Sequence, residues 1–213
     1  MKDLIIVGAG ETGRERLDAI KKINAIEKKW NIKGFLSDVP DVLDGIECDY
    51  PIIDTIADYN PKENDVFVCG IAMPCPKEKV VNILKAKGAF FETIIHPKSC
   101  VGDFVKFGEG CYIRGSISPN ARLGNFVSIM YSLIGGSSII GDYSTTTGYS
   151  NIAGAKLGKR VFVGSHAVVL GNVKVGDDSV IGTGSIVFTD VPANVTVMGN
   201  PATILVRHKN LEH

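Results

Sequence analysis

A six-residue repeat in the second half of the chain limits the possible folds more than any other feature. Its clearest run has an aliphatic residue at Leu157, Val163, Val169, Val175, Ile181 and Val187. Less regular copies reach back through Ile152, Ile140, Ile134, Ile129, Leu123, Ile117, Ile113, Phe107, Val101 and Ile95, with Thr146 breaking the run. Helices repeat every 3.6 residues and half-buried strands every 2, so neither explains this spacing. The period predicts a short unit stacked on copies of itself.

Three such hexapeptides make one triangular coil of about 18 residues, with the aliphatic residues inside and polar residues at the corners. Stacked coils bury a continuous apolar column, which a single repeat does not provide. We therefore predict a left-handed parallel β-helix, an exception to the usual right-handed crossover. A β-sandwich with frequent turns is the alternative, but sandwiches do not hold a strict period over six repeats.

The first 93 residues have a different pattern, in which strands and helices alternate. Strands are predicted within residues 2–10, 31–38, 65–70 and 90–95, and helices over 11–30 and 76–88. This order predicts a small, Rossmann-like parallel sheet with helices on it. We therefore expect an α/β N-terminal domain over residues 1–93 and a β-helix over 94–206. Residues 207–213 form a tail whose last three residues, Leu-Glu-His, look like the start of a cloning tag.

Composition excludes several classes of function. Lys plus Arg equals Asp plus Glu at 23 each, so there is no general attraction to nucleic acid or to an anionic membrane. No stretch approaches the roughly 20 apolar residues of a membrane-spanning helix, and the N-terminus lacks a signal-peptide pattern. Five cysteines without a CxxC pair indicate reduced thiols in a cytoplasmic protein, with no disulfide framework and no metal site.

The segment VGAGETG follows a predicted strand and opens a predicted helix, the context in which backbone N–H groups hold a phosphate. Gly8, Gly10 and Gly13 form this loop, and Asp38 ends the second strand, where it could accept hydrogen bonds from a ribose or a uracil. About 93 residues are too few for the sheet that holds a whole dinucleotide. The loop therefore favours one nucleotide, with a purely structural loop as the alternative.

Three segments carry a resemblance to a known family. They are the GAGETG loop, the connection IIHPKSC at residues 94–100, and the tail DVPANVTVMGNPA at residues 190–202. Together with the repeats, they resemble the hexapeptide-repeat sugar O- and N-acetyltransferases of the sialic-acid O-acetyltransferase type. The resemblance implies a homotrimer, acetyl-CoA as co-substrate between adjacent β-helices, and a UDP-linked sugar at the N-terminal loop, in surface-glycan synthesis.

The resemblance also implies site residues. The backbone amide of Gly154 would stabilise the oxyanion of the reacting thioester. Gly154, Gly164, Ser165 and Thr183 match positions that contact the cofactor. The cations that could meet the phosphates of CoA, or could simply be solvated, are Lys159, Arg160, Lys174 and Arg207.

The family's usual histidine base is missing. Its position falls on Gly136, and a second frequent histidine falls on Thr145. Gly136 and Gly154 are 18 residues apart, so we expect them to be stacked one coil apart. His166 and Asp142 are the candidate replacements for a general base. The alternative for each is an ordinary turn residue.

Two other groups are weaker candidates for proton transfer. Tyr143, beside Asp142, has the same alternative of a turn residue, and the position of His96 is structural in the family that the chain resembles.

A second departure lies after the third predicted strand. The family usually has a polar turn there, and this chain has the apolar segment GIAMPCP at residues 70–76. The main hypothesis is an acetyltransferase acting on a sugar. The alternative is a catalytically inactive trimer that binds CoA or a nucleotide sugar, or serves as a scaffold.

Overall fold

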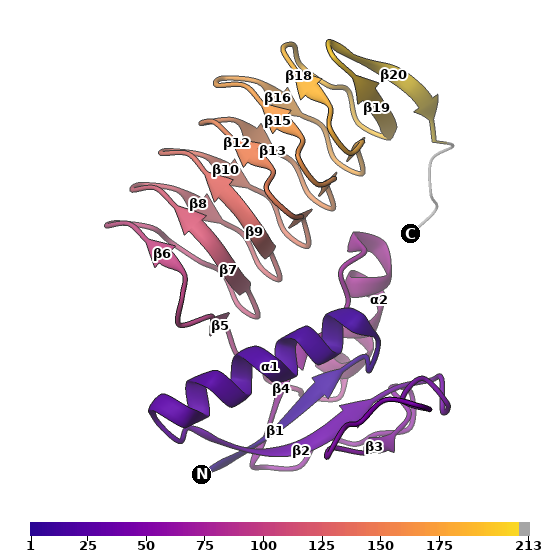
Figure 1. Cartoon of the computed structure of the whole chain (residues 1–213). Coiled ribbons are helices and arrows are strands. Elements are labelled where there is room, and N and C mark those ends of the chain that lie inside the picture. Colours follow the sequence, from indigo (N-terminus) through magenta and orange to yellow (C-terminus); the bar gives the residue numbers. More distant parts are fainter. Residues whose placement is uncertain (209–213) are drawn as a thin grey trace. The chain divides into compact units, whose positions relative to one another are not determined.

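The computed structural model describes residues 1–208, which divide between Pro97 and Lys98 into two compact units (Figure 1). The predicted tag remnant, Leu211 to His213, lies outside the described residues. Within residues 1–208, no helix combines the length and the apolar character needed to cross a membrane.

The first unit is a four-stranded parallel sheet with two helices, as predicted. The strands are β1 (Lys2–Val7), β2 (Trp30–Leu36), β3 (Ile52–Asp54) and β4 (Asp65–Cys69), in the order β3-β2-β1-β4. Their neighbouring pairs are all parallel. The helices are α1 (Glu11–Ile26) and α2 (Pro74–Ala86). In the central strand β1, the side chains of Leu4 to Val7 are completely enclosed.

The boundaries differ from the sequence prediction in three places. Helix α1 ends at Ile26, four residues early, because the Asn24 side chain redirects the chain: its Oδ1 accepts the N–H groups of Lys29 and Trp30. Strand β3 was not predicted, since three residues carry too little pattern. The predicted strand over residues 90–95 is reduced to a bridge between Phe91 and Phe67 and to β5 (Ile94–Ile95).

The second unit is a three-sided prism of short parallel strands (Figure 1). One face consists of β8 (Arg122–Leu123), β10 (Ile139–Ile140), β13 (Lys156–Leu157) and β16 (Lys174–Val175). The second face contains β11 (Thr145–Thr146), β14 (Phe162–Val163), β17 (Val180–Ile181) and β19 (Val195–Gly199). The third face contains β6 (Cys100–Val101), β12 (Asn151–Ile152), β15 (Val168–Val169) and β18 (Ile186–Val187).

Two longer strands, β7 (Tyr112–Ile117) and β9 (Ser128–Ile134), run around the corner between the second and third faces. They join the two faces into one continuous sheet. At the C-terminal end, β20 (Ala202–Arg207) pairs antiparallel with β19. These features confirm the predicted left-handed parallel β-helix.

The core of the prism is the aliphatic column that the period predicted. Leu157, Val163, Val169, Val175 and Ile181 are all at most 3% exposed. Thr146, which interrupts the sequence pattern, is also fully buried in this column, and its Oγ1 has no hydrogen-bond partner.

The beginning of the predicted column was wrong. Ile95 is 40% exposed and belongs to the first unit, and Val101 is 38% exposed. Val101 lies in the first coil, which has a neighbouring coil on one side only, so its side chain is only partly covered.

Coil length varies by one or two residues along the prism. Ile152 pairs with Ile134, 18 residues earlier, whereas Leu157 pairs with Ile140, 17 residues earlier. The turn after Ile152 is therefore one residue shorter than the turn after Ile134, which matters for the candidate site.

Candidate active site

The residues between the strands form three corners, and each corner is a column of residues in the left-handed backbone conformation. Corner A contains Asn120, Ser137, Gly154 and Asn172. Corner B contains Phe126, Tyr143, Arg160 and Asp178. Corner C contains Tyr131, Tyr149, His166 and Gly184. Backbone hydrogen bonds between successive coils hold each column in register.

Gly136 and Gly154 are neighbours at corner A, as the 18-residue spacing predicted. The carbonyl oxygen of Gly136 lies 3.4 Å from the point where a Cβ on Gly154 would be. Because the turn after Ile152 is short, Gly154 takes the left-handed position, with φ of 78°, that Ser137 takes in the coil before. Gly136 has an ordinary φ and is exposed, and a Cβ there would meet only the carbonyl oxygen of Pro119 within 3.4 Å.

The amide of Gly154 points into the protein. Its N–H donates to the carbonyl of Ile152 and to Ser138 Oγ, both at 3.1 Å. Ser138, which sequence reasoning missed, is fully buried and also donates to Gly135 O at 2.7 Å. The only signal for it was the small residue four positions after Ile134. An oxyanion role for the Gly154 amide therefore requires the peptide to rotate away from Ser138.

Four of the predicted residues come together at corner C: Gly164, Ser165, His166 and Thr183. A Cβ on Gly164 would lie 2.7 Å from the Thr183 nitrogen, so these two backbones are in close contact. Ser165 Oγ lies 3.3 Å from Thr147 Oγ1.

The imidazole of His166 is exposed and stacks on the Tyr149 ring, with centroids 5.5 Å apart. The ring is therefore held by an aromatic neighbour and open to solvent.

Asp142 lies at corner B, and its contacts are those of a turn-bracing residue. Its Oδ1 accepts the Asn125 N–H at 2.8 Å, and its Oδ2 lies 3.6 Å from Lys159 Nζ. Asp177 repeats this role by accepting the Lys159 N–H at 2.8 Å. Tyr143 stacks on Phe126, with centroids 5.3 Å apart.

Gly154, His166 and Asp142, the residues predicted to take part in catalysis, do not meet within a single chain. They occupy corners A, C and B of the prism, and each corner is a separate edge because the strands between them form flat faces. Thr145, where the family's second histidine falls, is completely buried.

The four candidate cations differ in availability. Arg160 makes a bidentate pair with Asp178, at 2.6 and 2.8 Å, and Lys159 faces Asp142. Lys174 in β16 and Arg207 in β20 are exposed. Paired and buried guanidinium groups bind a new anion only by giving up their partner, so the exposed cations are the better candidates for a phosphate.

The glycine-rich loop borders an open cleft of about 340 Å³ in the first unit. Gly8, Gly10, Glu11 and Thr12 line one wall, and the other consists of Gly70, Ile71, Ala72, Met73 and Pro76. The N-terminus of α1 lies beside it. The N-cap residue of this helix is Gly10, which has no side chain to accept a hydrogen bond from the first amides. The Arg14 side chain donates a hydrogen bond from Nη1 to the Ala9 carbonyl oxygen, at 3.0 Å.

Gly13 lies behind this cleft rather than in it. A Cβ on Gly13 would be 1.8 Å from the carbonyl oxygen of Gly8, and a Cβ on Gly70 would be 2.7 Å from the Gly13 Cα. The glycines therefore allow α1, the loop and the turn after β4 to touch.

Asp38 and His96 are away from this cleft's lining. The Oδ1 of Asp38 accepts the Ile56 N–H at 2.9 Å and so braces a turn. His96 is 2% exposed within the first unit, in line with a structural position.

The thiol of Cys69 lies at the end of β4, immediately before the cleft-lining Gly70. Burial raises the pKa of Cys69, and the nearby charges of Lys77 and Arg16 oppose this only in part. Both of these cations are buried as well. The thiol is therefore neutral at physiological pH and is not a nucleophile.

Comparisons with known proteins give this geometry a family. Residues 154–189, which include Gly154 and the corner C residues His166 and Gly184, match the bacterial transferase hexapeptide model of six repeats. This part of the chain is thus similar to the hexapeptide-repeat transferases. A serine acetyltransferase of Synechococcus elongatus is 38% identical over 103 residues, which are 43% of this chain and 42% of that protein. The chain thus spans about two fifths of the length of this curated relative.

Two solved structures are similar over nearly the whole chain. WeeI from Acinetobacter baumannii has a TM-score of 0.80 and 26% identity, covering 96% of this chain and all of that one. PerB from Caulobacter crescentus, solved in complex with CoA and GDP-perosamine, has a TM-score of 0.84 and 21% identity, covering 96% and 97%. Both units of the chain therefore have the fold of these hexapeptide-repeat proteins.

Among the described residues, no cluster of three His, Cys, Asp or Glu side chains could hold a metal ion.

Proposed function

We propose that this chain is an acetyl-CoA-dependent acyltransferase that acetylates an amino or hydroxyl group of a nucleotide-linked sugar in surface-glycan synthesis in the cytoplasm. The observation that carries the proposal is the likeness, over 96% of the chain, to a structure that holds both CoA and a nucleotide sugar. The hexapeptide match over corner C supports the same reading.

The nucleotide part of the substrate is assigned to the cleft at the glycine-rich loop. The free N-terminal amides of α1 and the open side of Gly10 suit a phosphate. The apolar wall of Ile71, Met73 and Pro76 suits a flat base or the apolar face of a sugar better than a charged group. We assign the nucleotide as UDP. GDP is the second candidate, because PerB was solved with GDP-perosamine.

The acetyl-transfer site is assigned to corner A of one copy facing corner C of another. Within one chain these two corners lie on different edges of the prism, so Gly154 and His166 meet only if copies associate. A closed ring of three prisms would bring these two corners together three times by the same contact. We therefore propose a homotrimer with acetyl-CoA in the groove, along Gly164, Ser165 and Thr183.

In this arrangement the sugar amine or hydroxyl attacks the thioester carbon, the carbon–sulfur bond breaks, and CoA leaves as the thiolate. A backbone N–H at corner A stabilises the oxyanion. The proton of the attacking group goes to a base, for which Gly136 offers no side chain. The imidazole of His166 from a neighbouring copy takes this role, and an amine that arrives neutral needs it least.

The second candidate function is a trimer that binds CoA or a nucleotide sugar without turnover. Two observations favour it: the position of the usual histidine is Gly136, and the Gly154 N–H is directed at Ser138 Oγ.

The two functions are separated by measuring thiol release from acetyl-CoA with a panel of UDP- and GDP-linked amino sugars. His166→Asn is the informative variant, because Asn tolerates the left-handed conformation at this corner whereas most residues do not. Phe104→Asn, at another exposed left-handed position, is the matched control.

We expect sugar-dependent thiol release by the natural chain, a loss of about 10²-fold or more in His166→Asn, and no change in Phe104→Asn. No release with any sugar, together with release after Gly136→His, would establish the inactive alternative. Equal rates in the natural chain and in His166→Asn would remove His166 from the mechanism.

A further inference from the structure

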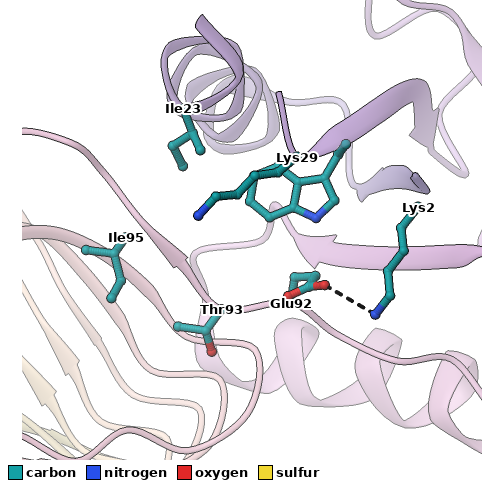
Figure 2. A pocket seen from close by; sticks show the side chains of 7 residues that line it. Lys2, Ile23, Lys29, Glu92, Thr93 and Ile95 are labelled. Carbon is teal, nitrogen blue, oxygen red and sulfur yellow. Dashed lines mark ion pairs between the residues drawn. The ribbon is translucent and has the colours of Figure 1, made fainter. Parts of the chain in front are cut away.

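A second cavity, of about 430 Å³, lies in the first unit at the opposite edge of the sheet from the glycine-rich loop (Figure 2). It is lined by Lys2, Ile23, Lys29, Trp30, Glu92, Thr93 and Ile95. Lys2 and Trp30 are the first residues of β1 and β2, whereas the glycine loop follows the other end of β1. Six residues of strand separate the two sites by roughly 20 Å. The cavity is therefore distinct from the nucleotide cleft.

The most informative lining residue is Trp30. Its side chain is 92% buried, because only 8% is exposed, yet its indole N–H makes no hydrogen bond to the residues that the structure describes. The indole nitrogen is not one of the fully enclosed side-chain atoms that lack a partner, so solvent or a ligand can reach it. The backbone of Trp30 is fixed by Asn24, whose side chain bonds both its N–H and its carbonyl. The backbone of Trp30 is thus held in place at the wall of the cavity, and its indole N–H has no acceptor among the described residues.

The charges of the lining favour an anion. Lys2 and Lys29 contribute two positive charges and Glu92 one negative charge, which leaves the wall with one net positive charge. Glu92 lies 3.7 Å from Lys2 Nζ, and Lys2 also lies 4.9 Å above the Phe90 ring, so the first lysine already has neighbours.

Among residues 1–208, Lys29 is paired only with Glu27, at 3.5 Å. Glu27 is 73% exposed, and exposed pairs of this kind are weak. The Lys29 ammonium is therefore the cation most easily recruited by a ligand.

The remaining lining is apolar. Figure 2 shows Ile23 and Ile95 on one side of the cavity and the Lys2–Glu92 pair on the other. Ligand sites combine this kind of apolar wall with a few fixed polar groups, and their volumes start at about 300 Å³.

We propose that this cavity binds a small organic anion. Its carboxylate or phosphate accepts hydrogen bonds from the Trp30 indole N–H and from Lys29 Nζ, and its apolar part packs on Ile23 and Ile95. Glu92 limits the affinity, because its negative charge faces the same space.

The chain's single tryptophan reports directly on occupancy. Intrinsic fluorescence of the full chain is titrated with hexanoate and with hexyl phosphate, and with hexanamide as the uncharged control. We expect a saturable change with at least one anion and binding at least ten-fold weaker for the amide, because charge-assisted hydrogen bonds are lost. The tighter of the two anions identifies the head group. No saturable change with either anion, or equal binding of the amide, overturns the proposal.

Two variants change the lining charge in opposite directions. Lys29→Met keeps most of the aliphatic stem and should weaken anion binding by about ten-fold. Glu92→Gln should tighten it by a few-fold, because it removes the repulsive charge while keeping the shape. Lys28→Met, an exposed neighbour outside the lining, is the matched control and should leave binding unchanged. Equal effects of Lys29→Met and Lys28→Met would mean that the anion is held by general surface charge and would overturn the proposal.

Trp30→Phe tests the indole donor while retaining an aromatic ring. Because this variant lacks the fluorophore, its binding is measured by calorimetry, beside the natural chain. We expect binding several-fold weaker. An unchanged affinity would show that the indole N–H does not contact the ligand and would contradict the proposed geometry.

Discussion

Gly13 in the glycine-rich loop and Gly136 at corner A are both glycines at candidate binding sites, and their surroundings are opposite. At Gly13 a single added carbon would be 1.8 Å from a backbone oxygen. At Gly136 the same carbon would meet one carbonyl oxygen at 3.3 Å and otherwise open space. The first glycine is required by close packing of backbone on backbone. The second has no such requirement and simply lacks a side chain.

This difference shows how a glycine in a functional segment is to be interpreted. Where a Cβ would clash, glycine is part of the architecture and its presence says little about the ligand. Where a Cβ would fit, glycine marks a place in which a side chain has been lost or was never needed. Gly136 is of the second kind, so the lack of a base there is a chemical feature and not a steric necessity.

The largest expected effect is that of Gly13→Ala. The added carbon must displace the backbone of Gly8 or the start of α1, and we expect a loss of about 3–5 kcal/mol in the free energy of unfolding. Chemical denaturation of the two variants Gly13→Ala and Gly10→Ala measures this. Gly10 has no atom within 4 Å of its Cβ position and an ordinary φ, so its variant should stay within about 1 kcal/mol of the natural chain.

The two neighbours at corner A should also differ. Gly154→Ala places a side chain at φ of 78° and should cost about 1–2 kcal/mol of stability. Gly136→Ala has no such strain and should cost less than about 1 kcal/mol. Thermal unfolding compares the two. Equal losses would contradict the distinction between a required and a dispensable glycine.

The buried thiol of Cys69, near the glycine-rich loop, should be protected from alkylation, in contrast to the exposed thiol of Cys100 in the prism. Burial raises the pKa of Cys69, which lowers its thiolate fraction at pH 8, whereas Cys100 is exposed. We expect iodoacetamide to label Cys69 at least about ten-fold more slowly, as measured by peptide mass spectrometry. Labelling of Cys69 at the rate of Cys100 would indicate that the region around Gly70 opens readily.

The smallest expected effect is a gain. Thr146 places an unpartnered hydroxyl in the aliphatic column of the prism, and valine has the same shape without the polar atom. Thr146→Val should therefore stabilise the chain by about 1 kcal/mol. The shift in the midpoint of chemical denaturation measures it, with Thr203→Val on the outside of β20 as the control that should not stabilise. A loss of stability would mean that the hydroxyl has a partner inside the prism.

Much of the site could be predicted because it depends on spacing along the chain. The 18-residue separation correctly placed Gly136 beside Gly154, since parallel coils of nearly equal length stack residues about 18 apart. The cluster of Gly164, Ser165 and His166 is consecutive in sequence, and Thr183 follows one coil later. The length of α1 was wrong, because the turn depends on contacts between Asn24 and a backbone six residues away.

Sequence alone determined the prism, because an aliphatic residue at every sixth position leaves one way to bury all of them. Through the resemblance, it also predicts that the position of the usual histidine falls on Gly136. Only the tertiary structure decided which corner each candidate occupies, that Ser138 holds the Gly154 amide, and that Trp30 presents an unused donor to a cavity. These three features depend on turns that differ in length by one residue and on hydrogen bonds between segments far apart in the sequence. The local sequence pattern predicts neither.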